Sequence, residues 1–106
     1  MKTSGAKLSE AVIKHVESVH NGLVTNVIVA GKSGCSDLIA CINGKYFALE
    51  IKGDDDTEKP LQDEHLKNVA RAGGYGGYVY SVEDAEDIIT NLKHPDIPPT
   101  ISQFSF

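Results

Sequence analysis

The chain has few cysteines, only two among its 106 residues. Disulfide scaffolds need several paired cysteines, and structural zinc sites need four Cys or His ligands, so neither is expected. No apolar run approaches the roughly 20 residues that a membrane-spanning helix needs. The first residues, 1–7, are polar and unlike a secretory signal. We therefore expect a cytoplasmic protein of a bacterium or a phage-infected host cell, without zinc and without a membrane partner.

Basic residues are also scarce. Ten Lys and Arg stand against fifteen Asp and Glu, a formal net charge of -5. At first sight this balance argues against a partner as anionic as nucleic acid. The imbalance is uneven, because residues 1–52 carry six basic and four acidic groups (+2) and residues 53–106 carry four basic and eleven acidic groups (-7). Any anion-binding surface should draw on the first half of the chain.

The length, with 41% hydrophobic and 24% charged residues, fits one globular domain. Hydrophobic periodicity and turn residues predict a helix, three strands, a helix, a strand and a helix. The predicted ranges are Leu8–Val19, Val24–Ala30, Ser36–Ile42, Lys45–Lys52, Pro60 to the glycine pair at 73–74, Tyr75–Ser81 and Val82 to about Lys93. This order predicts an α/β domain over residues 1–93, an α+β sandwich with a small mixed sheet flanked by helices. Residues 94–106 are predicted to be a proline-rich tail that docks on the domain or on a partner subunit.

Three residues mark helix ends in the sequence. Ser4 and Ser81 stand where an N-terminal cap is expected, and Ser81 is followed three residues later by Asp84. Gly22 follows the first helix and is predicted to end it.

A hairpin is predicted at Asn43-Gly44, because both positions of a two-residue turn need positive φ. With this loop, Ile42 faces Lys45, and Asp37 consequently faces Glu50. Side chains at directly opposed positions have Cβ atoms about 4.5 to 5.5 Å apart, and like charges there destabilise a sheet. A divalent cation is the natural compensation for two such acids.

Strand alternation puts Lys52 on the same face as Glu50. The opposite face is predicted to be core, formed by Leu38, Ala40, Phe47 and Leu49. Carboxylate oxygens are preferred by Mg²⁺ or Mn²⁺, and Mg²⁺ keeps several coordination positions for water or phosphate. An ammonium beside such an ion can stabilise the transition state of phosphoryl transfer. The residues therefore predict hydrolysis of phosphodiester bonds.

The residues that carry this chemistry resemble the PD-(D/E)XK nuclease superfamily, and within it the VRR-NUC (virus-type replication-repair nuclease) family. The resemblance runs from about Ser9 to Asp87 and has two departures, Ser36 where the motif has proline and one lysine in 27–32 where relatives often carry arginine. It rests on the stretches Gly34-Cys35-Ser36-Asp37-Leu38-Ile39, Asn43-Gly44-Lys45-Tyr46-Phe47 and Glu50-Ile51-Lys52, and on Gln62 and Gly73-Gly74. It implies a restriction-endonuclease-like αβββαβ core.

The resemblance also implies roles for individual residues. Asp37, Glu50 and the backbone carbonyl of Ile51 would bind the metal, Lys52 would be the catalytic lysine, and Gln62 would reach the active site or the scissile phosphate. Independently of the resemblance, Gln62 occupies a helical stripe where a buried apolar residue is expected. The alternative for Gln62 is a cap or a hydrogen bond to a backbone end.

The family also has an acid on the first helix. Glu10 matches it best by its position near the helix start, and Glu17 is the substitute, since it projects in nearly the same direction. The alternative for either residue is a solvated position on the helix surface.

Several other patterns are weaker. Lys7, Lys14, Lys32 and Ser33 are candidates for contacts to DNA, although scattered lysines are usually solubilising. The acidic run 54–56 is expected to be a solvated loop rather than a metal site, and the four histidines have no metal-ligand spacing. The glycine-rich stretch 73–77 has the reverse of the order found in phosphate-binding loops, so no nucleotide cofactor is expected.

We therefore expect a Mg²⁺- or Mn²⁺-dependent endonuclease that cleaves DNA in replication, recombination or repair. By resemblance to stand-alone VRR-NUC domains, the expected substrate is branched DNA such as a Holliday junction, and the expected assembly is a homodimer. The main alternative is a non-catalytic module that binds DNA or a replication protein with the same fold. A third interpretation is a small α/β interaction protein in which the cross-strand acids are incidental.

Overall fold

The structure, a computed structural model, describes residues 4–28, 36–53 and 60–95. The elements follow the predicted order and form a four-stranded sheet with strand order β1-β2-β3-β4. Their bounds are α1 Gly5–Val19, β1 Leu23–Ile28, β2 Ser36–Ile42, β3 Lys45–Ile51, α2 Pro60–Arg71, β4 Tyr75–Val79 and α3 Val82–Asn91. The predicted α+β architecture with a mixed sheet is confirmed. The turn at 31–34, the acidic run at 54–58 and the tail beyond residue 95 lie outside the described residues.

The two N-terminal caps predicted from the sequence are confirmed. The Ser4 hydroxyl accepts a hydrogen bond from the backbone N–H of Lys7, and the Ser81 hydroxyl accepts one from Asp84. At its other end α1 stops at Val19, ahead of Gly22, and the left-handed residue between the two is Asn21, with φ 55°. Asn tolerates this conformation because its short side chain can hydrogen-bond locally.

Gly22 also serves the packing of α1. Its N–H donates to the Val16 carbonyl at 3.1 Å. A Cβ at this position would lie 2.8 Å from side-chain atoms of both Val16 and Ile42. The glycine therefore allows the end of α1 to pack closely against β2.

The hairpin has the predicted turn and register. Asn43 and Gly44 have φ of 51° and 77°, and Ile42 pairs with Lys45. Asp37 consequently pairs with Glu50. β1 continues the antiparallel pairing beside β2, whereas β4 runs parallel to β3.

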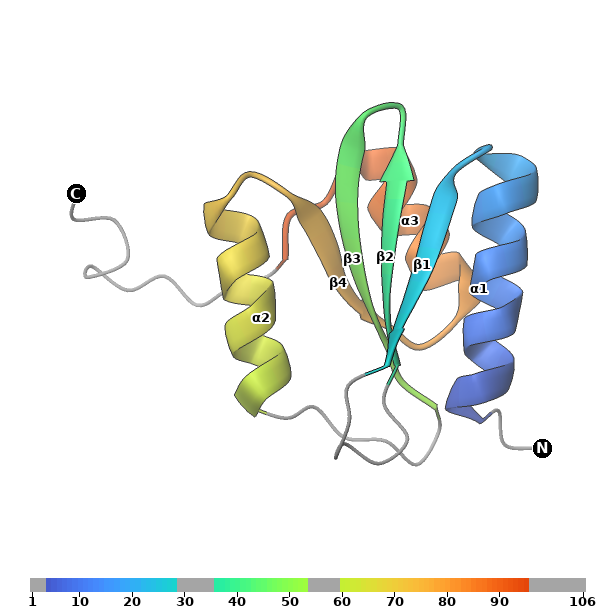
Figure 1. Ribbon diagram of the computed structural model, residues 1–106, viewed down its shortest axis with the longest axis horizontal. Coiled ribbons are helices and arrows are strands. Elements are labelled where there is room, and N and C mark those ends of the chain that lie inside the picture. The colour runs from blue at the N-terminus through green and yellow to red at the C-terminus, as the bar shows by residue number, and fades with distance from the viewer. Residues whose placement is uncertain (1–3, 29–35, 54–59, 96–106) are drawn as a thin grey trace.

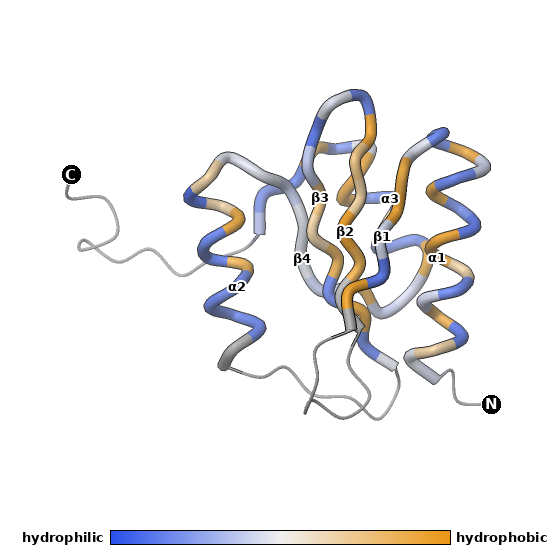
Figure 2. Tube along the Cα trace, viewed as in Figure 1, coloured by the Kyte–Doolittle hydropathy of each residue, from blue (hydrophilic) through white to orange (hydrophobic). Residues whose placement is uncertain are grey.

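The two faces of the sheet are covered differently. Helices α1 and α3 lie over one face and α2 over the other (Figure 1). The main core lies under α1 and α3, where the hydropathy colouring is mostly apolar along the strands (Figure 2). Its buried residues are Leu8, Val12, Val16, Leu38, Ala40, Ile42, Phe47, Leu49, Ile51, Val79, Ala85, Ile88 and Ile89. The predicted core residues of β2 and β3 are all among them.

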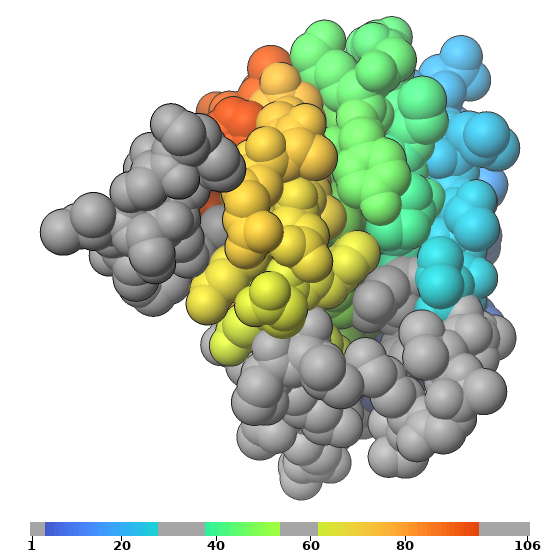
Figure 3. All heavy atoms as spheres, turned by 60° about the vertical axis from the view of Figure 1, so that its left-hand side comes forward, coloured from blue at the N-terminus to red at the C-terminus, as the bar shows by residue number. Residues whose placement is uncertain are grey.

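The α2 face has a smaller core, formed by Ala48, Leu66 and Val69. Figure 3 shows that α2, in yellow, covers only one side of this face, and that atoms of β2 and β3 in green and of β1 in cyan reach the surface beside it. Within the described ranges, no helix combines the length and apolar character needed to cross a membrane.

Candidate active site

One row of residues crosses the sheet at the end where β3 terminates. Asp37 on β2, Glu50 on β3 and Tyr78 on β4 occupy paired register positions. Paired positions share a sheet face, and this face is the one under α2. Glu50 is 1% exposed, and both of its carboxylate oxygens are buried. The sequence prediction that Asp37 and Glu50 oppose each other is confirmed for the backbone, while the side chain of Asp37 lies outside the described residues.

Lys52 follows β3 directly and continues its pairing, since its N–H donates to the Val79 carbonyl at 2.9 Å. Its side chain is 1% exposed, and its Nζ donates a hydrogen bond to Oε1 of Gln62. The same Nζ lies 5.6 Å from the centroid of the Tyr78 ring. A buried ammonium is costly unless it has polar partners, and the amide oxygen and the face of the aromatic ring provide them.

Gln62 reaches Lys52 from α2. It is 3% exposed and shares the buried stripe of that helix with Leu66 and Val69, as the spacing predicts. An amide in this apolar stripe is explained by its bond to the lysine. The buried pair Lys52 and Gln62 therefore joins the end of β3 to the first turn of α2.

Tyr78 is a site residue that the sequence analysis missed. Besides its ring contact to Lys52, its hydroxyl donates to the Asp63 carboxylate on α2. The alternation of side chains along a strand predicts that Tyr78 and the core residue Val79 lie on opposite faces of the sheet. It does not reveal the parallel register that pairs Tyr78 with Glu50. That register depends on how α2 connects the two strands.

The acids predicted on the first helix are exposed, and α1 covers the opposite face of the sheet. α1 begins at the end of the sheet where β3 ends and α2 begins (Figure 1). Glu10 therefore lies nearer this end than Glu17 by about 10 Å, at 1.5 Å of rise per residue. The arrangement favours Glu10, and its role as a ligand stays a prediction.

The remaining predicted residues are placed as follows. The side chain of Ile51 is buried in the main core, so only its backbone could serve a site on the α2 face. Lys7 and Lys14 are exposed on α1. Lys32 and Ser33 lie outside the described residues. The DNA contacts of these four polar residues stay predictions.

Another buried polar atom lies one turn beyond Gln62. Nε2 of His65 is buried and has no hydrogen-bond partner among the described residues.

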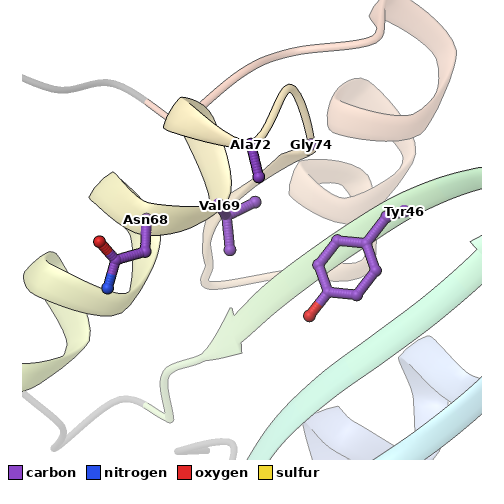
Figure 4. A pocket seen from close by; sticks show the side chains of 5 residues that line it. All are labelled: Tyr46, Asn68, Val69, Ala72 and Gly74. Carbon is purple, nitrogen blue, oxygen red and sulfur yellow. The ribbon is translucent and has the colours of Figure 1, made fainter.

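A pocket of about 300 Å³ lies at the opposite end of α2 from Gln62. It is lined by Tyr46, Asn68, Val69, Ala72 and Gly74, and Figure 4 shows the Tyr46 ring of β3 beside the last turn of α2. Its lining is mostly apolar, and it contains none of the predicted site residues. We therefore separate it from the candidate active site.

The donor set of the site fits a hard divalent cation. Two acids, Asp37 and Glu50, stand opposite each other, and the buried ammonium of Lys52 brings one positive charge to the same face. An ionised carboxylate as buried as that of Glu50 needs compensating charge. Carboxylate oxygens are the ligands that Mg²⁺ and Mn²⁺ prefer. Asp37 and Glu50 are thus the residues that would hold the ion.

The bond between Gln62 and Lys52 gives a stability prediction. Gln62→Leu suits the apolar stripe, yet we expect it to lower the free energy of unfolding by about 1 to 3 kcal/mol, because the buried ammonium loses an acceptor. Urea unfolding measures the change. In a Lys52→Met background, Gln62→Leu should leave the free energy of unfolding almost unchanged. Equal costs in both backgrounds would show that the amide does not serve the lysine.

No protein-family model, curated protein or solved structure matches this chain.

Proposed function

We propose that the protein is a Mg²⁺- or Mn²⁺-dependent endonuclease that hydrolyses phosphodiester bonds of DNA. The observation that supports this most is the buried Lys52 and Gln62 pair on the same sheet face as Glu50, which stands opposite Asp37. A lysine that served only solubility would keep its ammonium at the surface, because burial removes the ammonium from water and costs free energy.

Each residue of the group has a distinct task in this proposal. Asp37 and Glu50 would hold the divalent ion, which would supply activation of water and compensation of charge on the phosphate. Lys52 stabilises the negative charge that develops on the phosphoryl oxygens, because its position is fixed before the substrate arrives. Gln62 holds the lysine side chain in one rotamer through the bond to Nζ. Tyr78 packs its ring against the same ammonium and anchors the first turn of α2 through Asp63.

The charge distribution is consistent with a substrate that approaches a metal-loaded face. The net charge of -5 would repel DNA at long range. Binding of a divalent ion neutralises the two acids, so that the ammonium of Lys52 leaves the site with a net positive charge. DNA binding by this protein should therefore depend on the ion more strongly than in a basic nuclease.

We further propose branched DNA as the substrate and a symmetric homodimer as the active assembly, both on the basis of the family resemblance. A two-fold dimer presents two equivalent sites, one for each of two strands.

A cleavage assay tests the proposal. The protein is incubated with a four-way junction and with linear duplex of the same sequence, in Mn²⁺, in Mg²⁺ and in EDTA. We expect cleavage only with a divalent ion, and faster cleavage of the junction. Uptake of Mn²⁺ with DNA binding and no cleavage would instead support a non-catalytic DNA-binding module. Absence of both Mn²⁺ uptake and cleavage would contradict the proposal.

A further inference from the structure

A second group of metal-ligating side chains lies away from the candidate active site. His15 is on α1, His20 is the residue that follows α1, and Glu86 is on α3. Nε2 of His15 lies 2.5 Å from Oε1 of Glu86, and Nε2 of His20 lies 2.7 Å from the same oxygen. One ligand atom from each residue lies within 4.8 Å of the others. The two ring nitrogens therefore converge on one carboxylate.

The local backbone explains why sequence spacing did not predict this group. Residues five apart on an ideal helix project about 140° apart, so His15 and His20 would not share a ligand. The helix ends at Val19, and His20 has φ -105° instead of the helical value of about -63°. The two rings meet edge to face, with centroids 5.6 Å apart. Glu86 joins them only because α3 lies beside α1 over the same face of the sheet (Figure 1).

We propose that His15, His20 and Glu86 form a binding site for Zn²⁺ that links α1 to α3. Imidazole nitrogen and carboxylate oxygen are ligands of Zn²⁺, and two histidines with one glutamate are a known three-ligand set for this ion. Hard ions such as Mg²⁺ have little preference for imidazole, so this site and the carboxylates of the α2 face would select different metals.

The nitrogen-to-oxygen contacts need little change to accept the ion, while the two imidazole nitrogens, within 4.8 Å of each other, would settle at the spacing of zinc ligands. Tetrahedral ligands at about 2.0 to 2.1 Å from zinc stand roughly 3.3 Å from one another. The nitrogen-to-oxygen distances of 2.5 and 2.7 Å are hydrogen-bond distances, so each imidazole would move outward by a fraction of an ångström. The side chains of His15, His20 and Glu86 are 23%, 19% and 39% exposed. Solvent can therefore supply the fourth ligand.

The carboxylate is already prepared as a ligand. Its second oxygen, Oε2, accepts a hydrogen bond from the Thr90 hydroxyl at 2.5 Å, which fixes its orientation towards the histidines. That bond, followed by those from His15 and His20, lowers the pKa of Glu86 to about 2. A carboxylate cannot donate, so each Nε2 donates to Glu86. For Nε2 to bind zinc, each neutral imidazole would carry its proton on Nδ1 instead.

The two metal sites can be separated experimentally, because α1 and α3 lie on the sheet face opposite α2 (Figure 1). We would titrate Zn²⁺ into the Glu50→Gln variant by calorimetry at neutral pH. We expect one strong site in this background. Adding His15→Gln or His20→Gln should weaken zinc binding at least tenfold. The matched control is Glu83→Gln on the exposed surface of α3, which should leave zinc binding unchanged, whereas Glu86→Gln should weaken it.

A second measurement needs no substitution. Zn²⁺ added to the wild-type protein should shift the ring-nitrogen NMR signals of His15 and His20, and should leave those of His65 and His94 in place. Zinc that shifts only the other two histidines would overturn the proposal. Unchanged zinc affinity after the His15 and His20 substitutions would overturn it as well.

Discussion

Replacing Lys52 with methionine is expected to lower the rate of DNA cleavage by about 10²- to 10³-fold, the usual cost of removing one group that stabilises transition-state charge. Methionine has nearly the length and volume of the lysine stem, so the buried space near Tyr78 stays filled. The ammonium and its bond to Gln62 are lost. Single-turnover cleavage of the preferred substrate in Mn²⁺ measures the effect.

Lys45→Met is the matched control for this substitution. Lys45 is the first residue of β3, the strand that Lys52 follows; it is exposed and lies at the hairpin end, away from the site. We expect the Lys45→Met variant to cleave DNA at the wild-type rate. Lys52→Met should still bind Mn²⁺, because the proposed ligands are Asp37 and Glu50. Equal cleavage by the Lys52 and Lys45 variants would remove the lysine from the mechanism.

Replacing Glu50 with glutamine is expected to abolish both cleavage and the stabilisation of the protein by Mn²⁺. At a free concentration ten times its Kd, a ligand that binds only the folded state stabilises it by about 1.4 kcal/mol. For a domain of this size, each kcal/mol added to the free energy of unfolding raises the Tm by about 4 to 8 °C. The wild-type protein should therefore melt higher in Mn²⁺ than in EDTA, and the Glu50→Gln variant should melt at the same temperature in both.

Glu64→Gln controls for the change in net charge. Glu64 is exposed on α2, two residues after Gln62, and belongs to no part of the proposed site. Its variant should keep the Tm difference between Mn²⁺ and EDTA and should cleave normally. A Glu50→Gln variant with the full Mn²⁺ shift would show that the ion binds elsewhere.

The opposed acids could be predicted from the sequence because one local feature determines their register. A two-residue turn at Asn43-Gly44 allows one pairing of the flanking strands, and this pairing brings Asp37 opposite Glu50. The buried position of Gln62 followed from helical periodicity in the same way. Both predictions depend on short-range geometry.

Features that depend on long-range packing could not be predicted in this way. The pairing of Tyr78 with Glu50 requires the parallel register of β3 and β4, which the intervening helix sets. The convergence of His15 and His20 on Glu86 requires two helices far apart in the sequence to lie side by side.

The most direct test of the account is the location of Mn²⁺ in a crystal of the protein, identified by anomalous scattering. The account predicts an anomalous peak on the α2 face of the sheet, at about 2.1 Å from carboxylate oxygens of both Asp37 and Glu50. A peak that avoids both carboxylates, or a crystal in saturating Mn²⁺ with no peak beside Glu50, would contradict it.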